Sequence, residues 1–267
     1  MKKALLYLFV FFFIQYFTVV GVTAVSTLIG GGNVDDVLGS LSGKGEFGIG
    51  TTAMILASAI YSVLLLALFL WRKWAVVSPA WLRTRQWDVL FWSAIASLGT
   101  LVPSMWIQEL LPEMTDVSGA MIKEIISNQY GYFTICLFAP LVEELIFRGA
   151  ILKSLLGSIR KPWVAIVLSA VIFAVAHANP AQMPHAFLIS ILLGWMYYRT
   201  GSILPGVVLH WVNNTVCYAV YIVFPQSEDM PLSQIFGGDM RVLYAVLCSL
   251  CILLPALYQL YLRMKKA

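Results

Sequence analysis

Residues 4–29 read ALLYLFVFFFIQYFTVVGVTAVSTLI and contain no charged side chain. As an α-helix this stretch would extend roughly 39 Å, at about 1.5 Å per residue, and the hydrocarbon core of a bilayer is about 30 Å thick. Lys2 and Lys3 precede it, as basic residues precede the apolar region of a signal peptide, but that region has only about 7–15 residues. We therefore expect a retained first membrane span.

The rest of the chain is also rich in apolar residues and poor in charged ones. Of its 267 residues, 60% are hydrophobic and 11% are charged, against about 25% charged residues in soluble domains. The mean hydropathy is +0.85, which excludes a soluble globular protein. No segments of about ten residues alternate between apolar and polar side chains, which excludes an outer-membrane barrel. The formal net charge of +4 is too small to indicate a nucleic-acid partner.

Eight apolar segments predict an all-α, polytopic membrane protein with about eight transmembrane helices. We expect one membrane domain over residues 1–267, with a catalytic core at 130–224 inside the helix bundle. The predicted spans are residues 4–29, 49–71, 89–107, 130–156, 163–178, 184–198, 204–224 and 242–262.

The charges of the connecting segments predict the orientation, because basic residues are retained on the cytoplasmic side. With both termini cytoplasmic, most basic residues lie inside: Lys2, Lys3, Arg72, Lys73, Arg83, Arg85, Lys153, Arg160, Lys161, Arg199, Arg263, Lys265 and Lys266. Outside lie Lys44, Lys123, Arg241 and most acids: Asp35, Asp36, Glu46, Glu109, Glu113, Asp116, Glu124, Glu228, Asp229 and Asp239. We therefore expect a multi-pass protein of the cell (inner or plasma) membrane.

Few ionisable side chains remain at membrane depth: Glu143, Glu144, Arg148, His177 and His210. An ionised group at mid-bilayer costs at least about 2.5–3.5 kcal/mol, so such groups normally face a protein interior or a water-filled cavity. These residues are therefore the functional candidates.

Helical spacing separates their roles. Glu144 and Arg148 are one turn apart and share a face, which predicts a structural ion pair. Glu143 points about 100° away and has no counter-ion in its own helix, so it is the carboxylate suited to general base catalysis. It reaches the depth of His177 only if its helix continues past Arg148 toward Arg160.

Two other predicted spans also present polar groups at one-turn spacing. Phe173 and His177 share a face of the fifth span, and His210 and Asn214 share a face of the seventh. A carboxylate and a His can activate water, while a His and an Asn amide can donate hydrogen bonds to an oxyanion. This set is sufficient to hydrolyse an amide without a covalent intermediate. We interpret His185, at the outer mouth of the sixth span, as an interfacial residue, with a cavity-lining role as the alternative.

These residues resemble the three signatures of a known family. Residues 143–149 (EELIFRG) are similar to its E-E-x-x-x-R motif, 173–177 (FAVAH) to its F-x-x-x-H, and 210–214 (HWVNN) to its H-x-x-x-N. The family is that of the CPBP intramembrane proteases, which includes the type II CAAX prenyl endopeptidases and bacterial bacteriocin-processing or immunity proteins.

The resemblance implies a glutamate-dependent intramembrane endopeptidase that acts on a membrane-associated peptide or protein. Glu143 and His177 would activate water, and His210 and Asn214 would form the oxyanion hole. Glu144, Arg148 and Phe173 would support the site. No metal or cofactor is expected.

Three other hypotheses stay open. Glu143, His177 and His210 have the residue types of a zinc site with one position left for water. The chain could instead be a non-catalytic immunity or peptide-binding protein. Buried carboxylates and histidines also occur in proton-coupled transporters.

Overall fold

The computed structural model describes residues 1–42, 50–75, 87–227 and 230–264. All regular structure in these residues is helical. The long helices are α1 (Lys2–Ile29), α3 (Thr51–Trp71), α5 (Trp87–Glu109), α9 (Pro162–Ala176), α10 (Met183–Thr200), α11 (Leu204–Val223) and α13 (Asp239–Arg263). Shorter helices in the connections are α2 (Val34–Ser42), α6 (Gly119–Ser127), η3 (Pro225–Ser227) and α12 (Leu232–Phe236).

One further long helix runs without a break over residues 131–156 and carries both glutamates. It consists of η1 (Phe133–Phe138), α7 (Ala139–Glu143), η2 (Glu144–Leu152) and α8 (Lys153–Leu156), of which η1 and η2 are π-helical. The helix continues past Arg148 to Leu156, as expected from the depth of Glu143. The π-helical turns were not predicted.

Each of the eight predicted spans coincides with a long helix, which confirms the all-α, polytopic fold class. Among the described residues, α1, α3, α5, α11 and α13 have the length and hydropathy of membrane spans. Helix α9 is apolar but has only 15 residues. That the chain crosses the membrane about eight times stays a prediction.

Local sequence explains where several helices begin and end. Pro162 and Pro205 lie in the first turns of α9 and α11, where the missing N–H costs no hydrogen bond. Helix α10 ends at Gly201, whose φ of 63° lies in the left-handed region that glycine adopts readily. Helix α9 ends at His177, and the next residue, Ala178, has a φ of 51° although it is not glycine.

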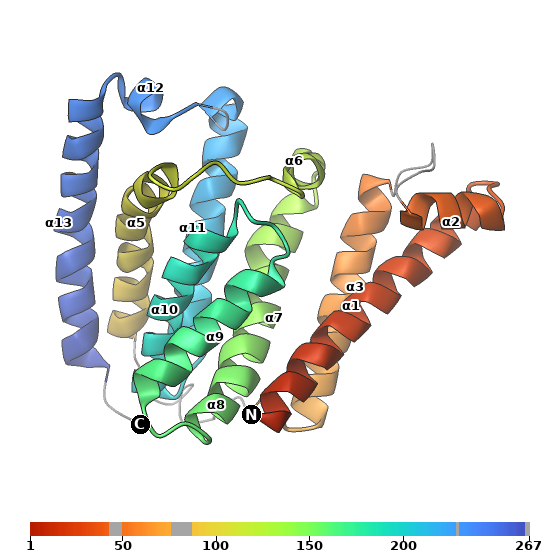
Figure 1. The fold of residues 1–267 in the computed structure, drawn as a ribbon, viewed down its shortest axis with the longest axis horizontal. Coiled ribbons are helices and arrows are strands. Elements are labelled where there is room, and N and C mark those ends of the chain that lie inside the picture. The colour runs from red at the N-terminus through yellow and green to blue at the C-terminus, as the bar shows by residue number, and fades with distance from the viewer. Residues whose placement is uncertain (43–49, 76–86, 228–229, 265–267) are drawn as a thin grey trace.

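The helices form a bundle in which successive long helices run in opposite directions (Figure 1). Helices α1 and α3 form a pair at one side (Figure 1). Helix α3 also contacts α6 and the 131–156 helix, and Oγ1 of Thr51 at its start donates a hydrogen bond to Oε2 of Glu124 on α6, at 3.0 Å. Helices α5 and α13 pack closely at Gly99, where a Cβ atom would come within 2.7 Å of the backbone of Leu253. Small residues allow such close contact between helices in membranes.

The described charged residues separate between the two ends of the bundle. The start of α1 and the end of α13 lie at the same end (Figure 1). The predicted inner residues Arg83, Arg85, Lys265 and Lys266, and the predicted outer residues Lys44, Glu46, Glu228 and Asp229, lie outside the described part of the chain.

Candidate active site

The motif residues come from three neighbouring helices. Glu143 is the last residue of α7 and Glu144 the first of η2, within the 131–156 helix. His177 follows the end of α9 directly, and His210 lies on α11. Because α9 packs against η2, and α11 packs against α7, these side chains meet in the interior.

Glu144 and Arg148 form a buried ion pair, as their spacing predicts. Nη1 of Arg148 lies 2.7 Å from Oε1 of Glu144, and the exposed fractions of the two residues are 1% and 0%. Nη2 of Arg148 donates a hydrogen bond to Oγ of Ser190 on α10, at 2.8 Å. The guanidinium also lies over the ring of Phe173, 4.3 Å from its centroid. One arginine therefore connects η2, α9 and α10.

His210 lies between the two glutamates. Its Nδ1 is 3.2 Å from Oε1 of Glu144, and its Nε2 is 3.8 Å from Oε2 of Glu143. Because a carboxylate can only accept, Nδ1 donates the hydrogen bond to Glu144. The other ring nitrogen, Nε2, faces Glu143. Gly206 makes room for this arrangement, since a Cβ atom there would lie 2.8 Å from Oε2 of Glu144.

Glu143 is the more accessible of the two glutamates. Its side chain is 24% exposed, whereas the side chain of Glu144 is 0% exposed. Glu144 is paired with Arg148, while the described ion pairs of Glu143 comprise a single, longer contact with His210. Glu143 is therefore the carboxylate that water and a substrate can reach.

His177 is half-buried and faces the same region, but no hydrogen bond or ion pair joins it to Glu143 among the described residues. Its Nδ1 lies 2.8 Å from the carbonyl oxygen of Phe173. Since a carbonyl can only accept, Nδ1 carries the proton and Nε2 is free to accept one. The ring of Phe173 lies between the two histidines, 4.7 Å from His177 and 6.0 Å from His210 by ring centroids.

Asn214 is half-buried and points toward the 131–156 helix. Its Nδ2 donates a hydrogen bond to the carbonyl oxygen of Ile135 in η1, at 3.0 Å. An amide nitrogen carries two protons, so one N–H remains for another acceptor.

A chain of hydrogen bonds that the sequence did not predict leads to Asn214. Nδ1 of His185 lies 3.0 Å from Oγ of Ser104 on α5, and its Nε2 lies 3.3 Å from Nδ2 of Asn213. The same Nδ2 donates to Oδ1 of Asn214 at 3.2 Å. His185 therefore contacts α5 and α11, and its position at the membrane interface stays a prediction. The sequence signal for this chain is the second asparagine, Asn213, next to Asn214 in an apolar segment.

The three residues considered as zinc ligands do not form a metal-binding cluster in the structure. No group of three or more His, Cys, Asp or Glu side chains has the geometry of a metal site in the part of the chain that the structure describes. Glu143 and His210 are neighbours, but His177 is held by the carbonyl of Phe173 instead.

Comparisons with known proteins bear on the same region. Residues 127–216, which contain all three motifs, match the family model described as type II CAAX prenyl endopeptidase Rce1-like. The UPF0177 protein YxdF of Lactococcus lactis subsp. lactis is 26% identical over 136 residues, which are 47% of this chain and 75% of that protein. No solved structure matches the chain. The resemblance to the type II CAAX prenyl endopeptidases is therefore confirmed.

Proposed function

From the match of residues 127–216 to the Rce1-like type II CAAX prenyl endopeptidases, we propose that this chain is an intramembrane endopeptidase. It hydrolyses a peptide bond of a membrane-associated protein or peptide with a water molecule that a glutamate and a histidine activate. The observation that carries the proposal is the buried Glu144–Arg148 pair, bound to His210, beside a Glu143 that is free and accessible.

Glu143 is the general base. It is the one of the two adjacent carboxylates that no arginine neutralises, and a general base must be able to take a proton from water. His177 assists it from the other side of the water molecule through Nε2, because Nδ1 is held by the carbonyl of Phe173.

His210 and Asn214 stabilise the oxyanion of the tetrahedral intermediate. With Nδ1 of His210 bonded to Glu144, its Nε2 is the ring nitrogen that faces Glu143 and the reacting peptide bond. Asn214 contributes the N–H that Ile135 does not use.

The substrate class follows from the location of the site. Glu144, Arg148 and His210 are buried among helices of a membrane protein, so a peptide bond must enter the bundle to reach them. We propose a substrate that is itself associated with the bilayer, and no nucleic-acid partner. We place the protein in the cell membrane with both termini in the cytoplasm.

The proposal is tested by comparing the N-terminal peptides of membranes that contain the parent chain or one of two variants. Glu143→Gln removes the general base but keeps the size of the side chain. Glu113→Gln is the control, because it removes a carboxylate from an exposed loop. New N-termini of membrane-associated proteins should appear with the parent and with Glu113→Gln, and not with Glu143→Gln. The same N-termini with Glu143→Gln would contradict the assignment, and no new N-termini with any chain would favour a non-catalytic binding protein.

The zinc mechanism uses nearly the same side chains and requires a separate measurement. We expect the purified protein to hold no stoichiometric zinc and to remain active after dialysis against a strong chelator. Asn214→Ala should lower the rate by about 10²–10³, as the loss of one oxyanion donor does in other enzymes. About one zinc per chain, with activity lost on chelation and restored by zinc, would establish a metalloprotease instead.

A further inference from the structure

A basic cavity opens at the end of the bundle where α1 begins. The 131–156 helix contributes to its wall and also carries the glutamates of the active site, but the two sites are separate. Its volume is about 600 Å³, and its walls include Lys2, Lys3, Lys73 and Lys153. Glu143 and Lys153 are ten residues apart in one continuous helix, which corresponds to about 15 Å.

The four lysines of this cavity are not neutralised by the protein. No carboxylate lies within 4.0 Å of any of them in the part of the chain that the structure describes. Other basic residues at this end have structural partners. Arg199 donates hydrogen bonds to the carbonyl oxygens of Tyr261 and Met264, at 3.0 and 2.7 Å, and Arg263 pairs with Asp88 at 3.1 Å. The lysine charges are therefore available to an anion.

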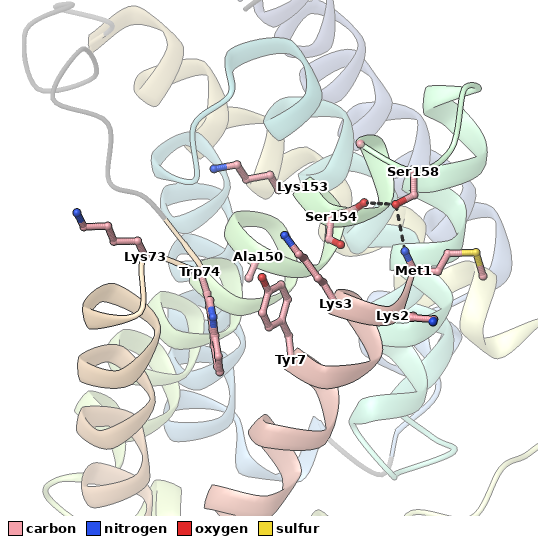
Figure 2. Close-up of a pocket in the computed structure, with 11 residues that line it drawn as sticks. Met1, Lys2, Lys3, Tyr7, Lys73, Trp74, Ala150, Lys153, Ser154 and Ser158 are labelled. Atoms are coloured by element: carbon pink, nitrogen blue, oxygen red, sulfur yellow. Dashed lines mark hydrogen bonds between the residues drawn. The ribbon is translucent and has the colours of Figure 1, made fainter.

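The other walls of the cavity combine aromatic rings and hydroxyl groups. Tyr7 and Trp74 pack against each other, with ring centroids 5.1 Å apart. In Figure 2, the rings of Trp74 and Tyr7 lie between Lys73 on the left and Lys3 on the right. Lys153 lies above the rings, and Ser154 and Ser158 lie on the same side as Lys3. Ser158 accepts a hydrogen bond from the backbone nitrogen of Met1 and donates one to the carbonyl oxygen of Ser154 (Figure 2).

The backbone at the rim of the cavity has an unusual conformation. Lys73 has a φ of 54°, which only glycine adopts without strain. This residue turns the chain after α3, so that the ring of Trp74 packs on Phe69 as well as on Tyr7, with centroids 5.2 and 5.1 Å away. The turn thus places an amino group and an aromatic ring at the same opening.

We propose that this cavity binds a phosphate group at the membrane surface. Several ammonium groups provide the charge, the hydroxyl of Ser154 can donate a hydrogen bond, and the Tyr7 and Trp74 rings offer an apolar surface to the group that carries the phosphate. Basic pockets between transmembrane helices bind anionic lipid head groups in this way. The phosphate can belong to a lipid head group or to a free phosphate, and both would use the same lysines.

The test uses the purified full-length chain in a neutral detergent and measures its thermal unfolding with three probes. The probes are a short-chain phosphatidylglycerol, a phosphatidylcholine of the same chain length, and inorganic phosphate. The variant Lys3→Gln/Lys153→Gln removes two charges from the cavity. The control Arg160→Gln/Lys161→Gln removes two charges from exposed positions at the same end of the bundle but outside the cavity.

We expect phosphatidylglycerol to raise the unfolding temperature of the parent and of the control more than phosphatidylcholine does. The cavity variant should need at least about tenfold more phosphatidylglycerol for the same shift. If inorganic phosphate produces the shift and competes with the lipid, the cavity takes free phosphate; if it does neither, the ligand is a lipid head group. Equal responses of the two double variants, or no response of the parent to either phosphate probe, would overturn the proposal.

Discussion

At the scale of single residues, the site depends on how the charge of Glu144 is shared. One oxygen, Oε1, contacts both Arg148 and His210, at 2.7 and 3.2 Å. The other oxygen, Oε2, is buried without a hydrogen-bond partner in the described residues. Burial of a charge is tolerated only when a partner of opposite charge compensates it. Glu144 and Arg148 therefore stabilise the site, and their mutual charge compensation is required for stability independently of catalysis.

We expect Arg148→Ala to destabilise the protein, because it leaves the carboxylate of Glu144 buried without its cation. Breaking such a pair costs about 3–5 kcal/mol. The measurement is thermal unfolding in detergent, with Arg160→Ala as the control, since Arg160 is exposed. Glu144→Gln should also lower the stability, whereas Glu143→Gln should leave it close to that of the parent. Equal unfolding temperatures for Arg148→Ala and Arg160→Ala would show that the pair contributes no stability.

A second residue-scale prediction concerns His185 as a positioning residue for Asn214. The hydroxyl of Ser104 donates to the carbonyl of Leu101 at 2.9 Å, so it accepts from Nδ1 of His185, and Nε2 of His185 is left to accept from Asn213. This order directs Oδ1 of Asn214 toward Asn213 and its N–H groups toward the 131–156 helix.

His185→Ala should therefore lower kcat by about tenfold with little change in KM, the effect of losing one hydrogen bond of about 1.4 kcal/mol. In the Asn214→Ala background the same change should have almost no further effect on kcat, because its action passes through Asn214. Equal losses in both backgrounds would show that His185 acts only on the general stability of the bundle.

At the scale of elements, the sequence predicts where the helices begin and end better than it predicts the hydrogen-bond pattern within them. The ends of the eight predicted spans agree closely with those of the long helices, because each apolar run is bounded by Pro, Gly or charged residues. The π-helical turns η1 and η2 have no such signal, because hydrogen bonds from residue i to i+5 depend on packing with neighbouring helices. They surround the glutamate pair, and π-helical turns are frequent at functional sites.

The same limit explains which contacts of the site could be predicted. The Glu144–Arg148 pair lies within one helix, so its spacing was sufficient. The position of His210 between two carboxylates, and of His177 away from Glu143, depends on how separate helices are rotated against each other. No pattern in a single helix contains that information.

The loop before α6 binds the segment that follows α9 through Asp116 and Asn179. We expect the contribution of this contact to the free energy of unfolding to depend on pH. Asn179 is fully buried two residues after His177, and its Nδ2 donates a hydrogen bond to Oδ1 of Asp116 at 2.8 Å. Burial alone would raise the pKa of Asp116, but this bond and those from the backbone of Ser118 and Gly119 outweigh it and lower the pKa below its ordinary value of 3.8. The ionised carboxylate is thus favoured in the folded protein.

Because the folded-state pKa is lowered, the contribution of Asp116 to stability is complete above the ordinary pKa and is lost as the pH falls below about 4. We expect the unfolding temperature of the parent to fall in this acid range more than that of Asp116→Asn. The control Glu113→Gln changes an exposed carboxylate of the same loop and should follow the parent. Parallel curves for the parent and Asp116→Asn would contradict the role of this carboxylate.

At the scale of the whole molecule, the alternating helix directions and the distribution of charge are mutually consistent. The helices that precede and follow each connection run in opposite directions, and α1 begins at the end where α13 finishes (Figure 1). The described basic residues of that end include the lysines of the cavity. At the other end, Asp35 and Glu113 belong to connections, and Asp239 is the first residue of α13. An even number of crossings predicts that both termini lie on the same side of the membrane, and the retention of basic residues predicts that this side is the cytoplasm.

Reporter fusions along the chain test this orientation. Fusions after Lys73, Lys161 and Lys266 should be cytoplasmic, and fusions near Ser40, Glu113 and Ser227 should be external. The fusion at Lys161 is the most informative, because it follows the 131–156 helix and precedes α9. A cytoplasmic reporter there, with an external one at Glu113, means that the glutamates cross the membrane on a single helix and that the lysine cavity faces the cytoplasmic leaflet, where anionic lipids are concentrated. An external reporter at Lys161 would remove the crossing that carries Glu143, and with it the depth at which a peptide bond in the membrane could meet this carboxylate.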